Sequence, residues 1–165
     1  MRIGLGRFGR DMSRDAAPAD LQVVADWIVS QRECRLWAGQ DVPFPLDPSA
    51  LSAQIGMPDA MNVALDDERG LAAFGQAVPL SPERAHLARV IVRPDARRQG
   101  VGRALVEALL SRAADAGFSL VTLNVCSDNV VAATPYSDLG FDRAEQPPGG
   151  SSSPDSWLMR RIIRA

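Results

Sequence analysis

The stretch from Val90 to Leu105 constrains this chain more than any other segment. An apolar run ends, an arginine-rich loop follows, and two glycines alternate where a helical apolar pattern begins. The segment is Val90-Ile91-Val92-Arg93-Pro94-Asp95-Ala96-Arg97-Arg98-Gln99-Gly100-Val101-Gly102-Arg103-Ala104-Leu105. Glycine lets the backbone approach a ligand closely, and a helix N-terminus supplies unpaired N–H groups with a partial positive charge. The pattern predicts a strand–loop–helix unit that binds a phosphate or pyrophosphate. The alternative is that the glycines only pack a helix against a strand.

Two common nucleotide motifs are excluded at this site. The dinucleotide fingerprint needs a third glycine at position 105, where the chain has Leu105. The P-loop needs a lysine, and every basic residue of the sequence is arginine. A Gly-x-Gly-x-x-Gly string does occur at residues 4–9, but only three residues precede it, and Pro18 interrupts the segment that should be its helix. We therefore expect no nicotinamide or flavin site there.

Two blocks of this sequence resemble the GNAT superfamily of acyl-CoA-dependent N-acetyltransferases. The first block, residues 97–102, matches that family's Arg/Gln-x-x-Gly-x-Gly/Ala signature in full. The second matches Asn-x-x-Ala-x-x-x-Tyr-x-x-x-Gly-Phe through Asn129, Ala132, Tyr136, Gly140 and Phe141. The resemblance extends from about His86 to Arg143. It implies an α/β (α+β) fold with a mixed, mostly antiparallel central sheet, flanked by helices and splayed at the acetyl-CoA site.

The resemblance also implies which residues hold acetyl-CoA. Backbone groups of Val90, Ile91 and Val92 would pair with the pantetheine arm, and one N–H would polarise the thioester carbonyl. The phosphate loop would hold the pyrophosphate through Arg97, Arg98, Gln99, Gly100, Val101, Gly102, Arg103 and Ala104. Asn129 would hydrogen-bond the pantetheine, although a helix N-cap is its alternative role.

Proton transfer is predicted for three side chains. The resemblance implies that Tyr136 protonates the leaving thiolate, with a core aromatic as its alternative; Pro135 beside it departs from a regular helix. The amine must lose a proton, and His86 stands about where the family often has a glutamate. We expect His86 to be the base or to orient a water, with Glu83 as the second candidate. The alternative is that His86 is a strand residue that only lines a pocket. The acids at 66–68 are predicted to form a solvated turn.

The predicted function is direct transfer of an acetyl group from acetyl-CoA to an amine in a ternary complex. Trp37, in a segment predicted as a loop from Leu36 to Pro45, is the candidate wall of the acceptor pocket. Seven acids stand against one arginine between Asp41 and Glu83, which suits a polyamine, an aminoglycoside or a protein N-terminus. The alternative function is an acyl-CoA-binding sensor or interaction module without turnover, and another acyl donor stays open.

Apolar periodicity predicts a single domain over residues 11–165 behind an extension at 1–10. Period-3.6 patterns predict helices through 18–28, 47–55, 101–116 and 129–139. Strands are predicted at 61–65, 71–78, 86–92, 120–125, from 141, and at 157–163, with a loop at 146–154. The strand at 120–125 is apolar on both faces, which favours a central position.

The remaining composition limits location and partners. The net charge of −2 does not favour nucleic-acid binding, and no apolar run reaches the length of a membrane span. We see no secretory signal, so a cytoplasmic location is the expectation. One histidine and two distant cysteines, Cys34 and Cys126, predict no metal site and no disulfide. The resemblance allows a homodimer, which is common in the family.

Overall fold

The computed structural model describes residues 12–126, 136–145 and 156–163. Its centre is a seven-stranded sheet in the order β1-β2-β3-β4-β5-β7-β6. The strands are β1 Ser13–Asp15, β2 Met61–Asp67, β3 Gly70–Pro79, β4 Arg84–Val92, β5 Leu120–Cys126, β6 Asp142–Ala144 and β7 Ser156–Ile162. Neighbouring strands are antiparallel except β4 and β5, which are parallel. The predicted mixed, mostly antiparallel sheet is confirmed.

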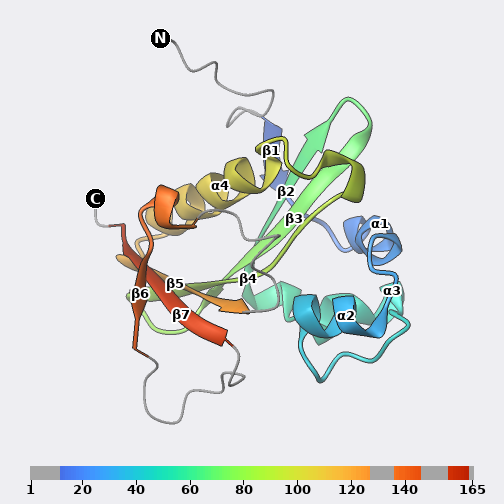
Figure 1. Ribbon diagram of the computed structural model, residues 1–165, viewed down its shortest axis with the longest axis horizontal. Coiled ribbons are helices and arrows are strands. Elements are labelled where there is room, and N and C mark those ends of the chain that lie inside the picture. The colour runs from blue at the N-terminus through green and yellow to red at the C-terminus, as the bar shows by residue number, and fades with distance from the viewer. Residues whose placement is uncertain (1–11, 127–135, 146–155, 164–165) are drawn as a thin grey trace.

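Helices cover both faces of this sheet (Figure 1). They are α1 Asp20–Asp26, α2 Gln31–Ala38, α3 Pro48–Gln54 and α4 Val101–Asp115, with 3-10 turns η2 Met57–Asp59, η3 Pro94–Ala96 and η5 Tyr136–Leu139. In Figure 1, α4 lies along one face and α1, α2 and α3 lie on the other. The sheet therefore separates two apolar layers.

Each layer has its own hydrophobic cluster. The α4 cluster contains Leu105 and Leu109 of the helix together with residues of β2, β3, β4 and β5. The α1–α3 cluster contains Leu21, Leu51 and Phe74 and lies over β2 and β3. Alternate side chains of a strand point to opposite faces, which is why β3 is buried along most of its length and supplies both clusters.

Gly75 lets α4 approach β3 closely. A Cβ at this position would lie 3.0 Å from Leu109 Cδ1 and 3.2 Å from Leu105 Cδ2. Contacts that short force neighbouring atoms to move. The glycine therefore fixes how deeply α4 sits on the sheet.

Helix α2 corrects the loop that the sequence analysis predicts from Leu36. The helix runs to Ala38 and includes both Leu36 and Trp37. Its N-terminus is a capping arrangement, in which Ser30 Oγ accepts from Glu33 N–H and the Glu33 carboxylate accepts from Val29 N–H. The buried residues of α2, Cys34, Trp37 and Ala38, do stand at helical spacing, but the helix is only eight residues long.

Several predicted segments fall outside the described residues. These are the extension at 1–10, the loop at 146–154 and residues 129–135 of the predicted fourth helix. The described end of that helix, Tyr136–Leu139, is a 3-10 turn. Within the described part of the chain, no helix is long and apolar enough to cross a membrane. The same residues contain no group of three or more side chains suited to hold a metal ion.

Candidate functional site

Strand β4 contains a bulge where the predicted site begins. Gln76 of β3 pairs with Ala88, whereas Phe74 pairs with Ile91, so two residues of β4 stand opposite Gly75. One of them, Arg89, has φ +53°, a left-handed conformation that is uncommon for a non-glycine residue. Such a bulge bends the strand and redirects its side chains.

Beyond this bulge, β4 and β5 part. Their last registered pair is Leu87 with Leu123, although β4 continues to Val92 and β5 continues to Cys126. On its other side β5 stays paired with β7 through Cys126. The predicted pantetheine-binding residues Val90–Val92 therefore have β3 on one side and no β5 partner on the other. An extended ligand can add to an unpaired strand edge of this kind.

The loop after β4 has the geometry of an anion site. Arg98 has φ +61° and Gly100 has φ +82°, and α4 starts at the next residue. Turns with left-handed residues point successive N–H groups inward and form concavities that bind anions. No side chain caps α4, so the N–H groups of its first turn are not occupied by a capping residue. This backbone fits a pyrophosphate.

The side chains of the loop hold it against the end of β4. Arg97 Nε donates to the Val92 carbonyl oxygen at 3.2 Å, and Gln99 Nε2 donates to the Asp95 carbonyl oxygen at 3.0 Å. Arg98 is exposed, and Arg103 pairs with Glu107 one turn along α4. The loop therefore offers an anion both backbone N–H groups and exposed guanidinium groups.

Arg93 ties this loop to the β2–β3 turn. Its Nη2 lies 2.5 Å from Asp67 Oδ2, its Nε lies 2.5 Å from Asp95 Oδ1, and its Nη1 also donates to the Leu71 carbonyl oxygen. The bond from Arg93 lowers the pKa of Asp67. The predicted solvated turn is thus corrected in part, because Asp67 is held by Arg93 and Asp66 by Arg14.

Trp37 reaches the bulge from the other layer. It is 9% exposed, and its Nε1 donates to the Arg89 carbonyl oxygen at 2.9 Å. The Arg89 side chain points to the same layer, where Nη1 donates to Gln76 Oε1 at 2.9 Å. The structure gives Trp37 this hydrogen bond to β4 and a tilted ring contact with Phe74 of β3, and its role as an acceptor wall stays a prediction.

His86 lies on the same face of β4 as Arg89. Its Nδ1 is 2.8 Å from Thr122 Oγ1 of β5. Burial, with a smaller contribution from the charges of Arg84 and Arg89, lowers the pKa of His86 from 6.5 to about 4. The imidazole is therefore neutral at pH 7 and accepts protons more weakly than the unshifted side chain assumed from the sequence.

Glu83 lies at the opposite end of β4 from Val90–Val92. It is exposed and precedes the strand, and its carbonyl oxygen accepts from the N–H groups of Ser119 and Leu120. Seven residues of extended chain between Glu83 and Val90 correspond to about 23 Å. The structure brings His86, Trp37 and the β4 edge into one region but does not bring Glu83 to that edge.

Tyr136 packs with the α4 cluster. Its ring lies edge-on to Phe141, with centroids 5.9 Å apart, and its carbonyl oxygen accepts from Phe141 N–H. Asn129, the other predicted residue of this block, lies outside the described residues. Their roles toward a ligand stay predictions.

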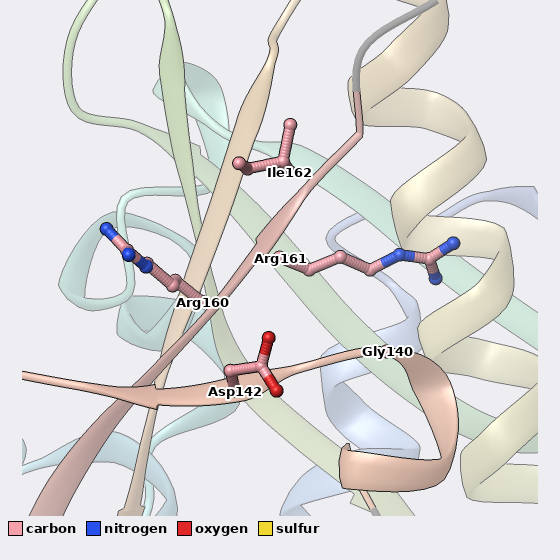
Figure 2. Close-up of a pocket in the computed structure, with 5 residues that line it drawn as sticks. All are labelled: Gly140, Asp142, Arg160, Arg161 and Ile162. Atoms are coloured by element: carbon pink, nitrogen blue, oxygen red, sulfur yellow. The ribbon is translucent and has the colours of Figure 1, made fainter.

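A hollow of about 280 Å³ lies elsewhere, beside β6 and β7. It is lined by Gly140, Asp142, Arg160, Arg161 and Ile162, none of which is a predicted site residue. Figure 2 shows the side chains of Arg160 and Arg161 pointing in opposite directions from β7. They do not converge on one ligand, so the parted strands and the phosphate loop remain the better candidate site.

Sequence reasoning missed two residues at this site. Arg89 forms the bulge, and Arg93 fixes the loop. The apolar–polar alternation of β4 gave no sign of an extra residue. The Arg93 contact joins segments 26 residues apart and left no local pattern.

Comparison with known proteins agrees with this geometry. The model of the acetyltransferase (GNAT) family matches residues 24–141. Among curated proteins, the ribosomal protein bS18-alanine N-acetyltransferase of Escherichia coli K12 is 36% identical over 84 residues. That match covers 51% of this chain and 56% of the relative, so the chain spans little more than half the relative's length.

Solved structures show the same fold. The crystal structure of the ribosomal-protein-S18-alanine N-acetyltransferase from E. coli has a TM-score of 0.66 and 27% identity, covering 93% of this chain and 94% of that one. The PaiA N-acetyltransferase from Thermoplasma acidophilum, solved in complex with coenzyme A, has a TM-score of 0.70 and 15% identity, covering 91% and 97%. At that identity the second likeness shows the fold alone.

Proposed function

The chain belongs to the acetyltransferase (GNAT) family, and from that premise we propose that it transfers an acetyl group from acetyl-CoA to an amine. The observation that carries the proposal is the parting of β4 and β5 after Leu87 and Leu123, beside an uncapped helix N-terminus. An unpaired strand edge and an anion-binding loop, one after the other, match an extended ligand with a pyrophosphate in its middle.

In the proposed reaction the amine nitrogen attacks the acetyl carbon directly. The C–N bond forms, the C–S bond breaks, the thiolate takes up one proton and the amine gives one up. An N–H of Val90–Val92 polarises the thioester oxygen as negative charge develops on it. Tyr136 donates the proton to the thiolate. His86, neutral at pH 7, orients the water that receives the amine proton.

The acceptor class is part of the proposal. The E. coli relative is named for an alanine of ribosomal protein bS18, which supports a peptide N-terminus as one acceptor. A free small-molecule amine is the other. We propose that the reaction takes place in the cytoplasm, where acetyl-CoA and newly made proteins are both present.

The first experiment measures CoA release from acetyl-CoA with pooled amines. The pools are polyamines, aminoglycosides, amino acids and short peptides, and a thermal-shift measurement reports acetyl-CoA binding in parallel. Turnover with one pool supports the enzyme and names its acceptor class. Binding without turnover in any pool favours the sensor alternative, and absence of both contradicts the proposal.

Tyr136→Phe separates catalysis from binding. Loss of a general acid should lower kcat by about 100-fold or more, because the thiolate then leaves without a positioned proton. The affinity for CoA should stay nearly unchanged, since the hydroxyl is the only group removed. Unchanged kcat with the best acceptor would contradict the role of Tyr136.

A further inference from the structure

Arg89 carries a charge that no carboxylate of the described residues balances. Of its five N–H donors, one binds the neutral amide oxygen of Gln76. Its Nε is shielded from water and has no hydrogen-bond partner. Within the described residues, no carboxylate forms an ion pair with this guanidinium. A buried cationic donor without a partner is costly, and it commonly marks a place where a ligand completes the site.

Two other arginines of the chain are paired with carboxylates. Arg14 binds both Asp20 and Asp66, and Arg93 binds both Asp67 and Asp95. These carboxylates raise the pKa of each arginine, whereas burial lowers the pKa of Arg89. Arg14 and Arg93 are therefore paired with carboxylates, whereas the described residues give Arg89 none.

The position of Arg89 connects it with the proposed reaction. It directly precedes Val90, and it lies two residues past the last β4–β5 pair. Trp37 and Gln76 fix its backbone and side chain from the α1–α3 layer, and His86 shares its face of β4. An amine that reaches the β4 edge from this layer passes the guanidinium.

Within the described residues, none of the acids that favoured a cationic acceptor forms an ion pair with Arg89. Asp66 and Asp67 are held by arginines, and Asp47 caps α3. The remaining acids of that segment are Asp41, Asp59, Glu68 and Glu83, and all of them are exposed. Arg84 and Arg89 add to the effect of burial in lowering the pKa of His86, and of these two arginines it is Arg89 that lies beside Val90.

We propose that the acceptor carries a carboxylate near its amine, and that Arg89 binds this carboxylate and positions the amine at the β4 edge. Either a free amino acid or a peptide whose first residues include an acid supplies this chemistry. Charge-assisted hydrogen bonds to a guanidinium are strong and directional, which suits the orienting role. The same positive charge disfavours the ammonium form and increases the fraction of reactive neutral amine. This inference rests on the proposed function.

The experiment compares acceptors in pairs that differ only in charge. One arm pairs free amino acids with their carboxamides, and the other pairs amidated peptides with Asp or Asn at the second position. The wild type should favour the carboxylate member of each productive pair. Arg89→Gln should reduce that preference in kcat/KM by roughly 10- to 100-fold, the worth of a hydrogen bond to a charged group. Conversion of the carboxylate to an amide also lowers the pKa of the amine. The readout is therefore the pair ratio, which is kcat/KM of the carboxylate member divided by kcat/KM of the uncharged member, compared between wild type and variant.

Matched variants guard against a structural effect. Arg160→Gln removes an exposed arginine from the same face of the sheet and should leave the pair ratio unchanged. Arg89→Lys keeps a charge and should retain part of the preference. The melting temperature and the KM for acetyl-CoA of Arg89→Gln should remain close to the wild-type values. An equal pair ratio in wild type and Arg89→Gln overturns the proposal.

A binding measurement keeps the two proposals separate. Isothermal titration of each acceptor into the CoA-loaded protein needs no turnover. If no acceptor is acetylated, the proposed function fails, and the Arg89 site is then judged by titration alone. Tighter binding of the carboxylate members, lost in Arg89→Gln, supports the site. Equal or undetectable binding overturns it.

Discussion

The indole of Trp37 donates a hydrogen bond to the backbone of the β4 bulge. Trp37→Phe keeps an aromatic ring but removes the donor to the Arg89 carbonyl oxygen. Leaving a buried acceptor unpaired should lower the free energy of unfolding by about 1–3 kcal/mol. Urea denaturation measures this change. Since the bulge precedes Val90–Val92, the KM for acetyl-CoA should rise as well.

Trp27→Phe is the matched control for this variant. Trp27 is also buried in the α1–α3 cluster, at 8% exposure, but it follows α1, whereas the helix that packs against β4 is α2. It should lose packing energy without changing the KM for acetyl-CoA. If both variants raise that KM equally, the Trp37 hydrogen bond does not position the bulge.

His86 gives a prediction about pH, and it is the single histidine of the chain. Its pKa of about 4 in the folded protein lies below the unfolded value of about 6.5. Between these values the unfolded state binds more protons, so the contribution of His86 to stability is full above pH 6.5 and is lost as the pH falls toward 4. The ring-proton resonance in an NMR titration should have its midpoint near pH 4. A midpoint near 6.5 would contradict the burial of the ring.

The residues of the site that lie within one short sequence motif could be predicted from the sequence. The glycines and arginines of 97–102 stand in one short stretch, and Gly100 has the left-handed φ that favours glycine. Arg89 has the same kind of φ without being glycine, because tertiary contacts from Trp37 and Gln76 hold it there. Sequence periodicity does not contain that information.

At the scale of elements, the ion pairs of Arg93 with Asp67 and Asp95 join the loop between β4 and α4 to the β2–β3 turn. We call these contacts the clamp of the loop. Arg93→Ala removes a contact in which both side chains are less than one-fifth exposed, and it leaves Asp67 without its guanidinium. We expect the free energy of unfolding to fall by about 1–3 kcal/mol and the KM for acetyl-CoA to rise, because the phosphate loop loses its anchor. Denaturation and steady-state kinetics measure the two effects.

Arg69→Ala is the control on the same clamp. Arg69 also binds Asp95, but its side chain is 74% exposed. Pairs this exposed contribute little, so melting temperature and kinetics should stay close to the wild type. Equal effects of the two substitutions would mean that the clamp does not position the loop.

Some helices and strands could be predicted from the sequence, and others could not. The long α4 and the strands β3, β4 and β5 carry strong apolar patterns and were predicted. Helix α2 was missed although Ser30 and Glu33 form its capping pair, since five of its eight residues are exposed and its apolar stripe is narrow. β1 is only three residues long and has no apolar pattern from which it could be predicted. Its pairing with β2 and the ion pair of Asp15 with Arg112 hold it in the sheet.

At the scale of the molecule, one ligand should join the two parts of the sheet. In the proposed complex, CoA lies between the parted strands and contacts the β4 edge and the start of α4, so its binding should stabilise the fold. At 100 times its Kd the gain is about 2.7 kcal/mol, which corresponds to a rise in Tm of about 5–10 °C for a chain of this size. Differential scanning fluorimetry measures the shift. Pantetheine, which lacks the pyrophosphate, should give a much smaller one; an equal shift would contradict the anion site at the loop.

The overall architecture was predictable from two separated motifs, and its acceptor side was not. The motifs fix a strand, a loop, a helix and a further strand in order, which is enough to identify the sheet. Contacts on the α1–α3 face of β4, such as that of Trp37 with Arg89, join residues 52 positions apart and leave no local pattern in the sequence. Charge counted along the sequence also could not show that Asp66 and Asp67 are already paired with arginines.

The two hydrophobic clusters on opposite faces of the sheet have a consequence for descent and for engineering. The phosphate loop and α4 belong to one cluster, and α1, α2 and α3 belong to the other. After gene duplication, substitutions in the α1–α3 cluster can change which acceptor is acetylated, while the α4 cluster preserves the proposed binding of acetyl-CoA. A laboratory lineage can follow the same route by recombining residues 20–57 between homologues and selecting for new acceptors.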